Sequence, residues 1–257
     1  MNNTFNEDKK DMKITEGECR NELFNKLKND EKFKNNIKNN PKLQTEKVHI
    51  YIGKEVPVPY RHIYRIVNDS LNLEIMCFDQ DIAFFDFFEL SEEKLEKLNE
   101  IIHINLEIES NKNFKENIES INDPKNKINS ISKENNKFFV FPYITIETKM
   151  GGGPDKPTTN SILVATKKVE LIKSVFPHCK SILLIFLDEN SEIPQRVYRC
   201  GKPFFDEILG LEFSYENSEI KFEEEKQEKS INTVKEKIEE LIIESIEDLQ
   251  NLNKKGV

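Results

Sequence analysis

The chain has 257 residues, of which 37% are hydrophobic and 33% are charged, and its formal net charge is −9. This length suits one mid-sized domain with extensions or two small domains. The negative charge of the whole chain argues against non-specific binding to nucleic acids or to anionic membranes. No run of apolar residues reaches the roughly 18 that a membrane-spanning helix needs, so we expect no membrane partner.

The charge is unevenly distributed. Residues 138–205 contain nine Lys and Arg against six Asp and Glu, a net charge of +3, whereas residues 214–257 contain seven against twelve. The acidic excess therefore lies mostly in the C-terminal tail. The four cysteines lack the CxxC spacing of a zinc site, and the N-terminus lacks the apolar segment of a signal peptide. We therefore expect reduced thiols and a cytoplasmic protein.

Residues 1–47 are polar, and their apolar residues recur at helical spacing, which predicts a helical extension. The stretch KVHIYIGKEVPVPY alternates apolar and polar residues and predicts a strand that ends at Pro57 and Pro59. NLEIMCFDQDIAFFDFFEL is apolar enough for one buried strand or two, and Ser91, followed by two Glu residues, predicts the start of a helix. Residues 110–136 are rich in Asn, Lys, Ser and Glu, and we expect a disordered insertion or a long loop there.

The second half of the chain predicts a strand, a loop, a helix and a second strand. KFFVFPYITIETK is the first strand, and the Gly-rich loop MGGGPDKPTTN follows it. The helix is expected to be capped by Asn160 or Ser161 and to end before Pro177. The continuous apolar run KSILLIFLDE suits an interior strand. A unit of this kind predicts two parallel strands, within an α/β domain that covers residues 48–213.

The acidic tail, residues 214–257, carries apolar residues at steps of three and four, which predict an amphipathic helix of about three heptads. Such a helix packs on its own domain or pairs with a second chain, and three heptads are too few to decide between the two. The second alternative gives a homodimer through this helix.

Glu147 and Lys149 lie where the first apolar strand of this unit ends, and their side chains are expected on the same face of the sheet. A carboxylate is a hard oxygen ligand for Mg²⁺, and Mg²⁺ lowers the pKa of a bound water and neutralises charge at a phosphodiester. The Lys149 ammonium is suited to orienting that water and contacting the phosphate. Because one carboxylate rarely holds Mg²⁺ alone, we expect a second acid nearby. The alternative interpretation is an exposed ion pair of little energetic value.

The segment Ile-Glu147-Thr-Lys149 at the end of an apolar strand resembles the ExK half of the PD-(D/E)xK nuclease motif. The helix and strand that follow are similar to those of that fold's αβββαβ core. The resemblance covers residues 73–205 and is closest to type II restriction endonucleases. It implies a central mixed β-sheet flanked by helices, Mg²⁺ as the cofactor, double-stranded DNA as the substrate, and hydrolysis of phosphodiester bonds.

The resemblance also implies an acid on the strand that pairs with the Glu147 strand. Asp81 is our preferred candidate because it opens an apolar run. Its position far upstream of Glu147 requires the low-complexity stretch to be an insertion between the two strands. The further candidates, in order of preference, are Asp86, Asp123 and Glu107.

The residues expected to contact DNA lie in the Gly-rich loop, on the helix after it, or in the basic stretch after the second strand. They are Gly151, Gly152, Gly153, Lys156, Lys167, Lys168, Arg196 and Arg199. Two other functions remain open. One is a non-enzymatic α/β interaction protein that binds a partner through its acidic helix, and the other is a PD-(D/E)xK nuclease of repair or of mobile elements.

Overall fold

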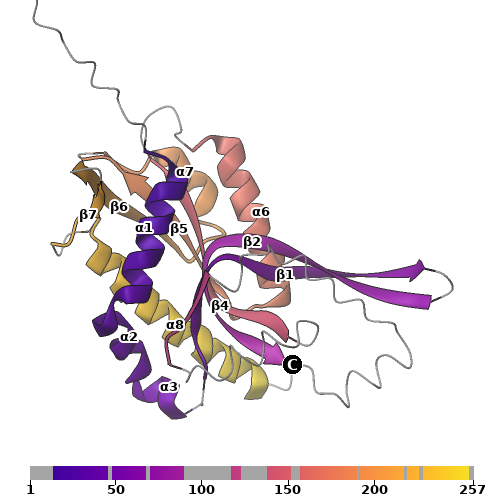
Figure 1. Cartoon of the computed structure of the whole chain (residues 1–257). Coiled ribbons are helices and arrows are strands. Elements are labelled where there is room, and N and C mark those ends of the chain that lie inside the picture. Colours follow the sequence, from indigo (N-terminus) through magenta and orange to yellow (C-terminus); the bar gives the residue numbers. More distant parts are fainter. Residues whose placement is uncertain are drawn as a thin grey trace, which may run out of the picture.

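The computed structural model describes residues 14–45, 48–67, 70–89, 117–122, 138–151, 157–189, 191–216, 219–225 and 228–254. Within these residues the chain forms a seven-stranded mixed sheet in the order β3-β1-β2-β4-β5-β6-β7, with helices on both of its faces (Figure 1). The α/β class with a mixed sheet and a C-terminal helix is therefore confirmed. The helix predicted at Ser91 and most of the stretch 110–136 lie outside the described residues.

One half of the sheet is antiparallel. Strands β1 (Tyr51–Val67) and β2 (Ser70–Glu89) form a hairpin, and β2 also pairs with β4 (Phe138–Met150). The short strand β3 (Ile118–Ser120) pairs with the start of β1. The apolar stretch around Asp81 is thus one long strand and not two.

The prediction that the first strand ends at its prolines is wrong, because β1 continues through Pro57 and Pro59 to Val67. Strand β3 pairs only with residues 51–53, so β1 is an edge strand at both prolines in the described part of the chain. A missing N–H is tolerated on an open edge. The register with β2 shifts directly after Pro59.

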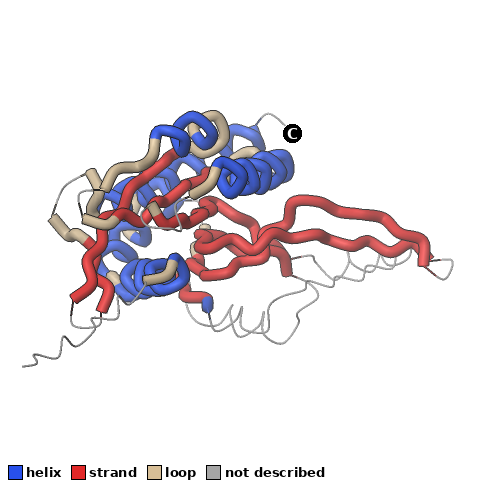
Figure 2. The backbone as a smooth tube through the Cα atoms, turned by 90° about the horizontal axis from the view of Figure 1, so that it is seen from above, coloured by secondary structure: helices blue, strands red, loops and turns tan. Residues whose placement is uncertain are grey.

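The distal parts of β1 and β2 project from the body of the molecule as a two-stranded ribbon (Figures 1 and 2). Its pairing runs from Arg61 opposite Met76 to Val67 opposite Ser70. At the base of this ribbon, Tyr60 stacks on Phe78 with ring centroids 3.8 Å apart.

The other half of the sheet is mainly parallel. Strand β4 leads through α6 (Thr159–Val175) to β5 (Lys180–Leu187), and α7 (Gln195–Gly201) leads to β6 (Glu207–Glu216). The pairs β4–β5 and β5–β6 are parallel, which confirms the predicted strand–helix–strand unit. The cap of α6 is Thr158 and not Asn160 or Ser161, because the Thr158 side chain accepts a hydrogen bond from Ser161 N. Strand β7 (Glu219–Phe222) then pairs with β6 in antiparallel fashion.

Four helices cover one face of the sheet (Figure 1). They are α1 (Glu16–Asn29), α2 (Glu31–Lys38), α3 (Pro41–Thr45) and α8 (Ile231–Lys254). Their apolar side chains join those of β2, β4 and β5 in the largest buried cluster. The predicted apolar stripe of α8 is part of this cluster, so it packs on its own sheet. Helices α6 and α7 cover the opposite face. No helix among the described residues is long and apolar enough to cross a membrane.

His178, which follows α6, is buried, with only 2% of its surface exposed. Its Nε2 lies 3.1 Å from the carbonyl oxygen of Pro142, and its ring stacks on Phe141 with centroids 4.7 Å apart. Burial lowers the pKa of this imidazole to about 4. The folded protein therefore holds His178 neutral at pH values where an unfolded chain already protonates it, below about 6.5.

This pKa predicts a loss of stability in acid. Between pH 6.5 and 4 the unfolded state binds more protons at this residue, so the free energy of unfolding falls as the pH falls, by up to about 3 kcal/mol. Urea unfolding of wild type and His178→Gln at pH 7.5 and 4.5 measures this, and the variant should show the smaller difference. The exposed His62→Gln is the control. Equal pH dependence of wild type and His178→Gln contradicts the prediction.

Candidate active site

Glu147 and Lys149 lie at the end of β4, where the strand leaves the core. Glu147 is only 7% exposed and Lys149 is half-buried. The Lys149 ammonium is surrounded by three oxygens: Glu147 Oε1 at 3.0 Å, Thr148 O at 2.6 Å and Glu16 Oε1 at 3.5 Å. Glu147 and Lys149 are therefore not an exposed ion pair on the surface. Both side chains are largely shielded from solvent, and Glu16 of α1 also contacts the Lys149 ammonium.

Asp81 lies beside this cluster. Its neighbour Ile82 pairs with Ile146, so the β2–β4 register places Asp81 next to Glu147. Asp81 Oδ2 accepts hydrogen bonds from Thr148 N at 2.7 Å and from Thr148 Oγ1 at 2.8 Å. Of the four acids considered from the sequence, the preferred one is thus next to the ExK segment.

The other candidate acids are not brought to this position by the described structure. Asp86 is paired with Phe141 and accepts a hydrogen bond from Phe87 N. It lies five residues further along β2, which corresponds to roughly 16 Å of extended strand. Asp123 and Glu107 lie outside the described residues.

Helix α1 contributes two residues that sequence reasoning missed, Glu16 and Arg20. They are four residues apart, so they share one face of the helix. Glu16 lies at Lys149, and Arg20 Nη1 donates to Asp81 Oδ1 at 2.5 Å. An acid in the first turn of a helix is also explained by the helix dipole. The sequence therefore gives no sign that Glu16 belongs to the site, because it looks like any acidic residue in the first turn of a helix.

Glu55 on β1 is a further acid near the site. Its carboxylate lies 3.5 Å from Arg20 Nη2, and its backbone has a φ of 55°. A positive φ is costly for a residue with a Cβ and is concentrated at functional sites. Three neighbouring strands, β1, β2 and β4, thus each contribute a carboxylate to one region.

The charges at this site are closely coupled. Burial alone would lower the pKa of Lys149, but the carboxylates of Glu147, Glu16 and Asp81 outweigh it and raise that pKa above its usual value. Lys149 is therefore a cation at neutral pH. Burial raises the pKa of Glu16, and the nearby Lys149 opposes this rise.

Lys168 on α6 is the second amine of the site. Its Nζ lies 3.4 Å from Glu147 Oε2, so each oxygen of Glu147 faces a lysine. The sequence suggested a contact of Lys168 with the DNA backbone. The structure places it against the carboxylate that carries the predicted chemistry.

The remaining residues predicted to contact DNA are spread around this site. Gly151 is buried, and a Cβ there would lie 2.5 Å from Leu187 Cδ2, so this glycine allows close packing against β5. Lys167 is exposed and pairs with Glu170, and Arg196 and Arg199 are exposed on α7. The other predicted loop residues, Gly152, Gly153 and Lys156, lie outside the described part of the chain.

The donor chemistry fits a hard divalent cation. Carboxylates and a main-chain carbonyl are the ligands that Mg²⁺ takes, and here such oxygens already surround a positive group, the Lys149 ammonium. Across the residues that the structure describes, however, no group of three or more His, Cys, Asp and Glu is arranged to hold a metal ion. Arg20 and Lys149 now occupy oxygens of Asp81, Glu147 and Thr148, so a metal bound by these oxygens would have to displace both side chains.

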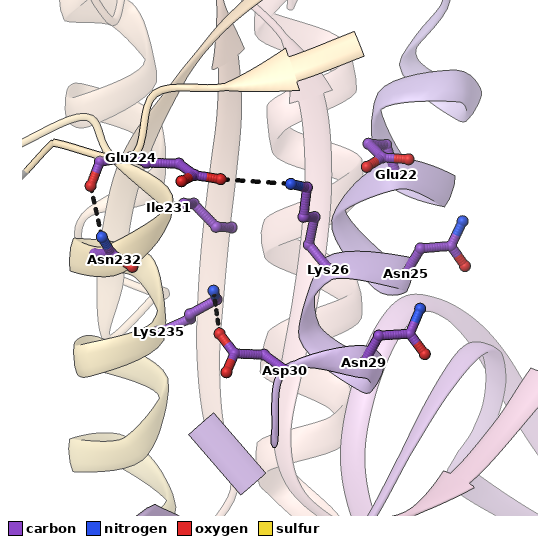
Figure 3. A pocket seen from close by; sticks show the side chains of 9 residues that line it. All are labelled: Glu22, Asn25, Lys26, Asn29, Asp30, Glu224, Ile231, Asn232 and Lys235. Carbon is purple, nitrogen blue, oxygen red and sulfur yellow. Dashed lines mark hydrogen bonds and ion pairs between the residues drawn. The ribbon is translucent and has the colours of Figure 1, made fainter. Parts of the chain in front are cut away.

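A separate polar cavity of about 460 Å³ lies between α1 and α8 (Figure 3). The ion pairs Lys26–Glu224 and Lys235–Asp30 lie at this cavity, at 3.4 and 2.5 Å. These pairs engage four of the five charged residues of the cavity, and no residue of the Glu147 site lines it, so we assign it no catalytic role.

No family model, curated protein or solved structure matches this chain significantly. The family resemblance therefore depends on Asp81, Glu147 and Lys149 and on the order of the elements around them.

Proposed function

We propose that this protein is a Mg²⁺-dependent endonuclease that hydrolyses double-stranded DNA, of the type II restriction kind. The observation that supports this most is the meeting of Asp81 and Glu147, from two adjacent strands, beside the ammonium of Lys149. An acid pair with a protonated amine where β4 leaves the core suits phosphodiester hydrolysis.

Each residue has a distinct role in this proposal. Asp81 and Glu147 would hold Mg²⁺, with the carbonyl of Thr148 as a third oxygen once the Lys149 ammonium has moved away from it. When bound, Mg²⁺ supplies an activated water and positive charge at the phosphate. Lys149, kept protonated by its acidic neighbours, orients the water and contacts the scissile phosphate. Lys168 adds a second positive charge on the α6 side.

The DNA is expected to lie across the exposed basic residues of α6 and α7, which include Lys167, Arg196 and Arg199. The two-stranded ribbon of β1 and β2 is a second possible contact, because a β-ribbon fits the major groove. Cleavage of both strands of a palindromic site in one binding event would use two copies of the site, one on each strand. The apolar face of α8 is buried in its own core, so a homodimer through α8 would use its polar side.

We place this activity in the cytoplasm, in keeping with four free thiols among the described residues.

A plasmid assay tests this function. We expect the protein with Mg²⁺ to convert supercoiled DNA to discrete linear fragments, and EDTA to prevent this. Discrete fragments favour restriction, whereas cleavage only at branched or damaged substrates favours a repair or mobile-element nuclease. No hydrolysis of any of these DNAs at any Mg²⁺ concentration contradicts the proposal and favours an interaction protein.

A further inference from the structure

Both oxygens of Asp81 are already used in this structure. Oδ2 accepts from the backbone and the hydroxyl of Thr148, at 2.7 and 2.8 Å. Oδ1 accepts from Arg20 Nη1 at 2.5 Å. The bonds to Oδ2 come from a residue fixed within β4, so Oδ1 is the oxygen that can become free for a metal. Whether Oδ1 is free depends on the position of Arg20, which belongs to a different element, α1.

The guanidinium of Arg20 is incompletely paired where it lies. Its Nη2 is 3.5 Å from Glu55 Oε1, at the limit of a hydrogen bond. Its Nε is buried and has no hydrogen-bond partner. A buried donor without a partner is unfavourable, which reduces the free energy needed to move this side chain away from Asp81.

A phosphodiester would offer Arg20 what this position lacks. Guanidinium groups bind phosphate through two parallel N–H···O bonds, and such a pair would give Nε an acceptor. The side chain of Arg20 is 21% exposed, so a phosphate can reach it from solvent.

We propose that Arg20 couples substrate binding to metal loading: it blocks Asp81 Oδ1 in the free protein and moves to a backbone phosphate when DNA binds, so that DNA and metal strengthen each other's binding. This inference rests on the proposed nuclease function. Coupling of this kind is reciprocal, so the factor by which DNA tightens metal binding equals the factor by which metal tightens DNA binding. It would keep the free enzyme from holding an active metal.

The test measures metal affinity and not catalysis. Calorimetry gives the Kd of Ca²⁺, a hard cation with oxygen ligands, for wild type and Arg20→Met, each with and without a short DNA duplex that a gel shows to remain intact. Arg20→Met removes the charge and retains an apolar stem. We expect it to bind Ca²⁺ at least about tenfold more tightly than wild type without DNA, a change of about 1.4 kcal/mol. The duplex should tighten binding in wild type and add little in the variant.

Two further variants complete the test. Lys38→Met removes one positive charge at an exposed position on α2, outside the residues assigned to metal or DNA, and should leave Ca²⁺ affinity within twofold of wild type. Arg20→Lys keeps the charge without the forked geometry and should fall between wild type and Arg20→Met, which keeps the test valid if Arg20→Met folds poorly. Equal Ca²⁺ affinity of wild type and both Arg20 variants, with binding lost in Glu147→Gln, overturns the coupling but leaves the nuclease proposal standing. Absence of Ca²⁺ binding in every protein overturns both.

Discussion

Replacing Glu147 by Gln is expected to reduce Mg²⁺-dependent DNA cleavage by roughly 10³-fold or more, equivalent to about 4 kcal/mol of transition-state stabilisation. The substitution keeps the shape of the side chain and removes the negative charge that Lys149 and Lys168 share. The neutral amide is a far weaker ligand for a hard cation than a carboxylate. Initial rates on plasmid DNA measure the loss, and circular dichroism verifies the fold.

Glu170→Gln is the matched control for this variant. Glu170 is an exposed carboxylate on α6 that pairs with Lys167, so its loss should change the rate less than twofold. Cleavage by Glu147→Gln at the wild-type rate would remove Glu147 from the mechanism.

Replacing Phe84 by Ala is expected to lower the free energy of unfolding by about 3–5 kcal/mol. Phe84 on β2 is fully buried and meets Phe33 of α2 edge to face, with ring centroids 6.0 Å apart. Since the N-terminal helices share this core with the sheet, Phe33→Ala should also be strongly destabilising. A double-mutant cycle should give a coupling energy of about 0.5–1.5 kcal/mol. Urea unfolding monitored by circular dichroism gives all of these values.

Phe88→Ala is the control for Phe84→Ala, because it removes the same side-chain atoms. Phe88 is on the same strand but 48% exposed, so its truncation should cost about 1 kcal/mol or less. Two results would contradict the described packing of α2 on the sheet. One is a free energy of unfolding of Phe84→Ala equal to that of wild type, and the other is a coupling energy of zero between Phe84 and Phe33.

The strand–helix–strand unit was predictable because each of its elements carries its own local signal. The run of Phe and Ile before Glu147 marks a strand, the Gly-rich loop ends it, and the continuous apolar run of β5 can only be satisfied inside a sheet. Asp81 ranked first because it heads an apolar run, as the family resemblance implies for the first acid. In the structure, however, it lies in the interior of β2 and does not open that strand. Its position beside Glu147 then follows from the antiparallel register.

The rest of the site depends on contacts between distant segments, which local patterns do not encode. Glu16 and Arg20 approach Lys149 and Asp81 only because α1 packs at the end of β4. The contact of Lys168 with Glu147 could not be predicted from the sequence either, since one lysine on a helix is usually a solvated charge. The prolines of β1 were misinterpreted because a sequence does not show which strands lie at the edge of a sheet.

Crystals grown with saturating Mn²⁺ and examined by anomalous diffraction test the central claim most directly. We expect an anomalous peak shared by the carboxylates of Asp81 and Glu147, with metal–oxygen distances of about 2.1–2.3 Å, and the Lys149 ammonium moved away from Thr148 O. Mn²⁺ bound elsewhere, with Lys149 still between Glu147 and Thr148 O and Arg20 still on Asp81, would contradict a metal-dependent active site at this position.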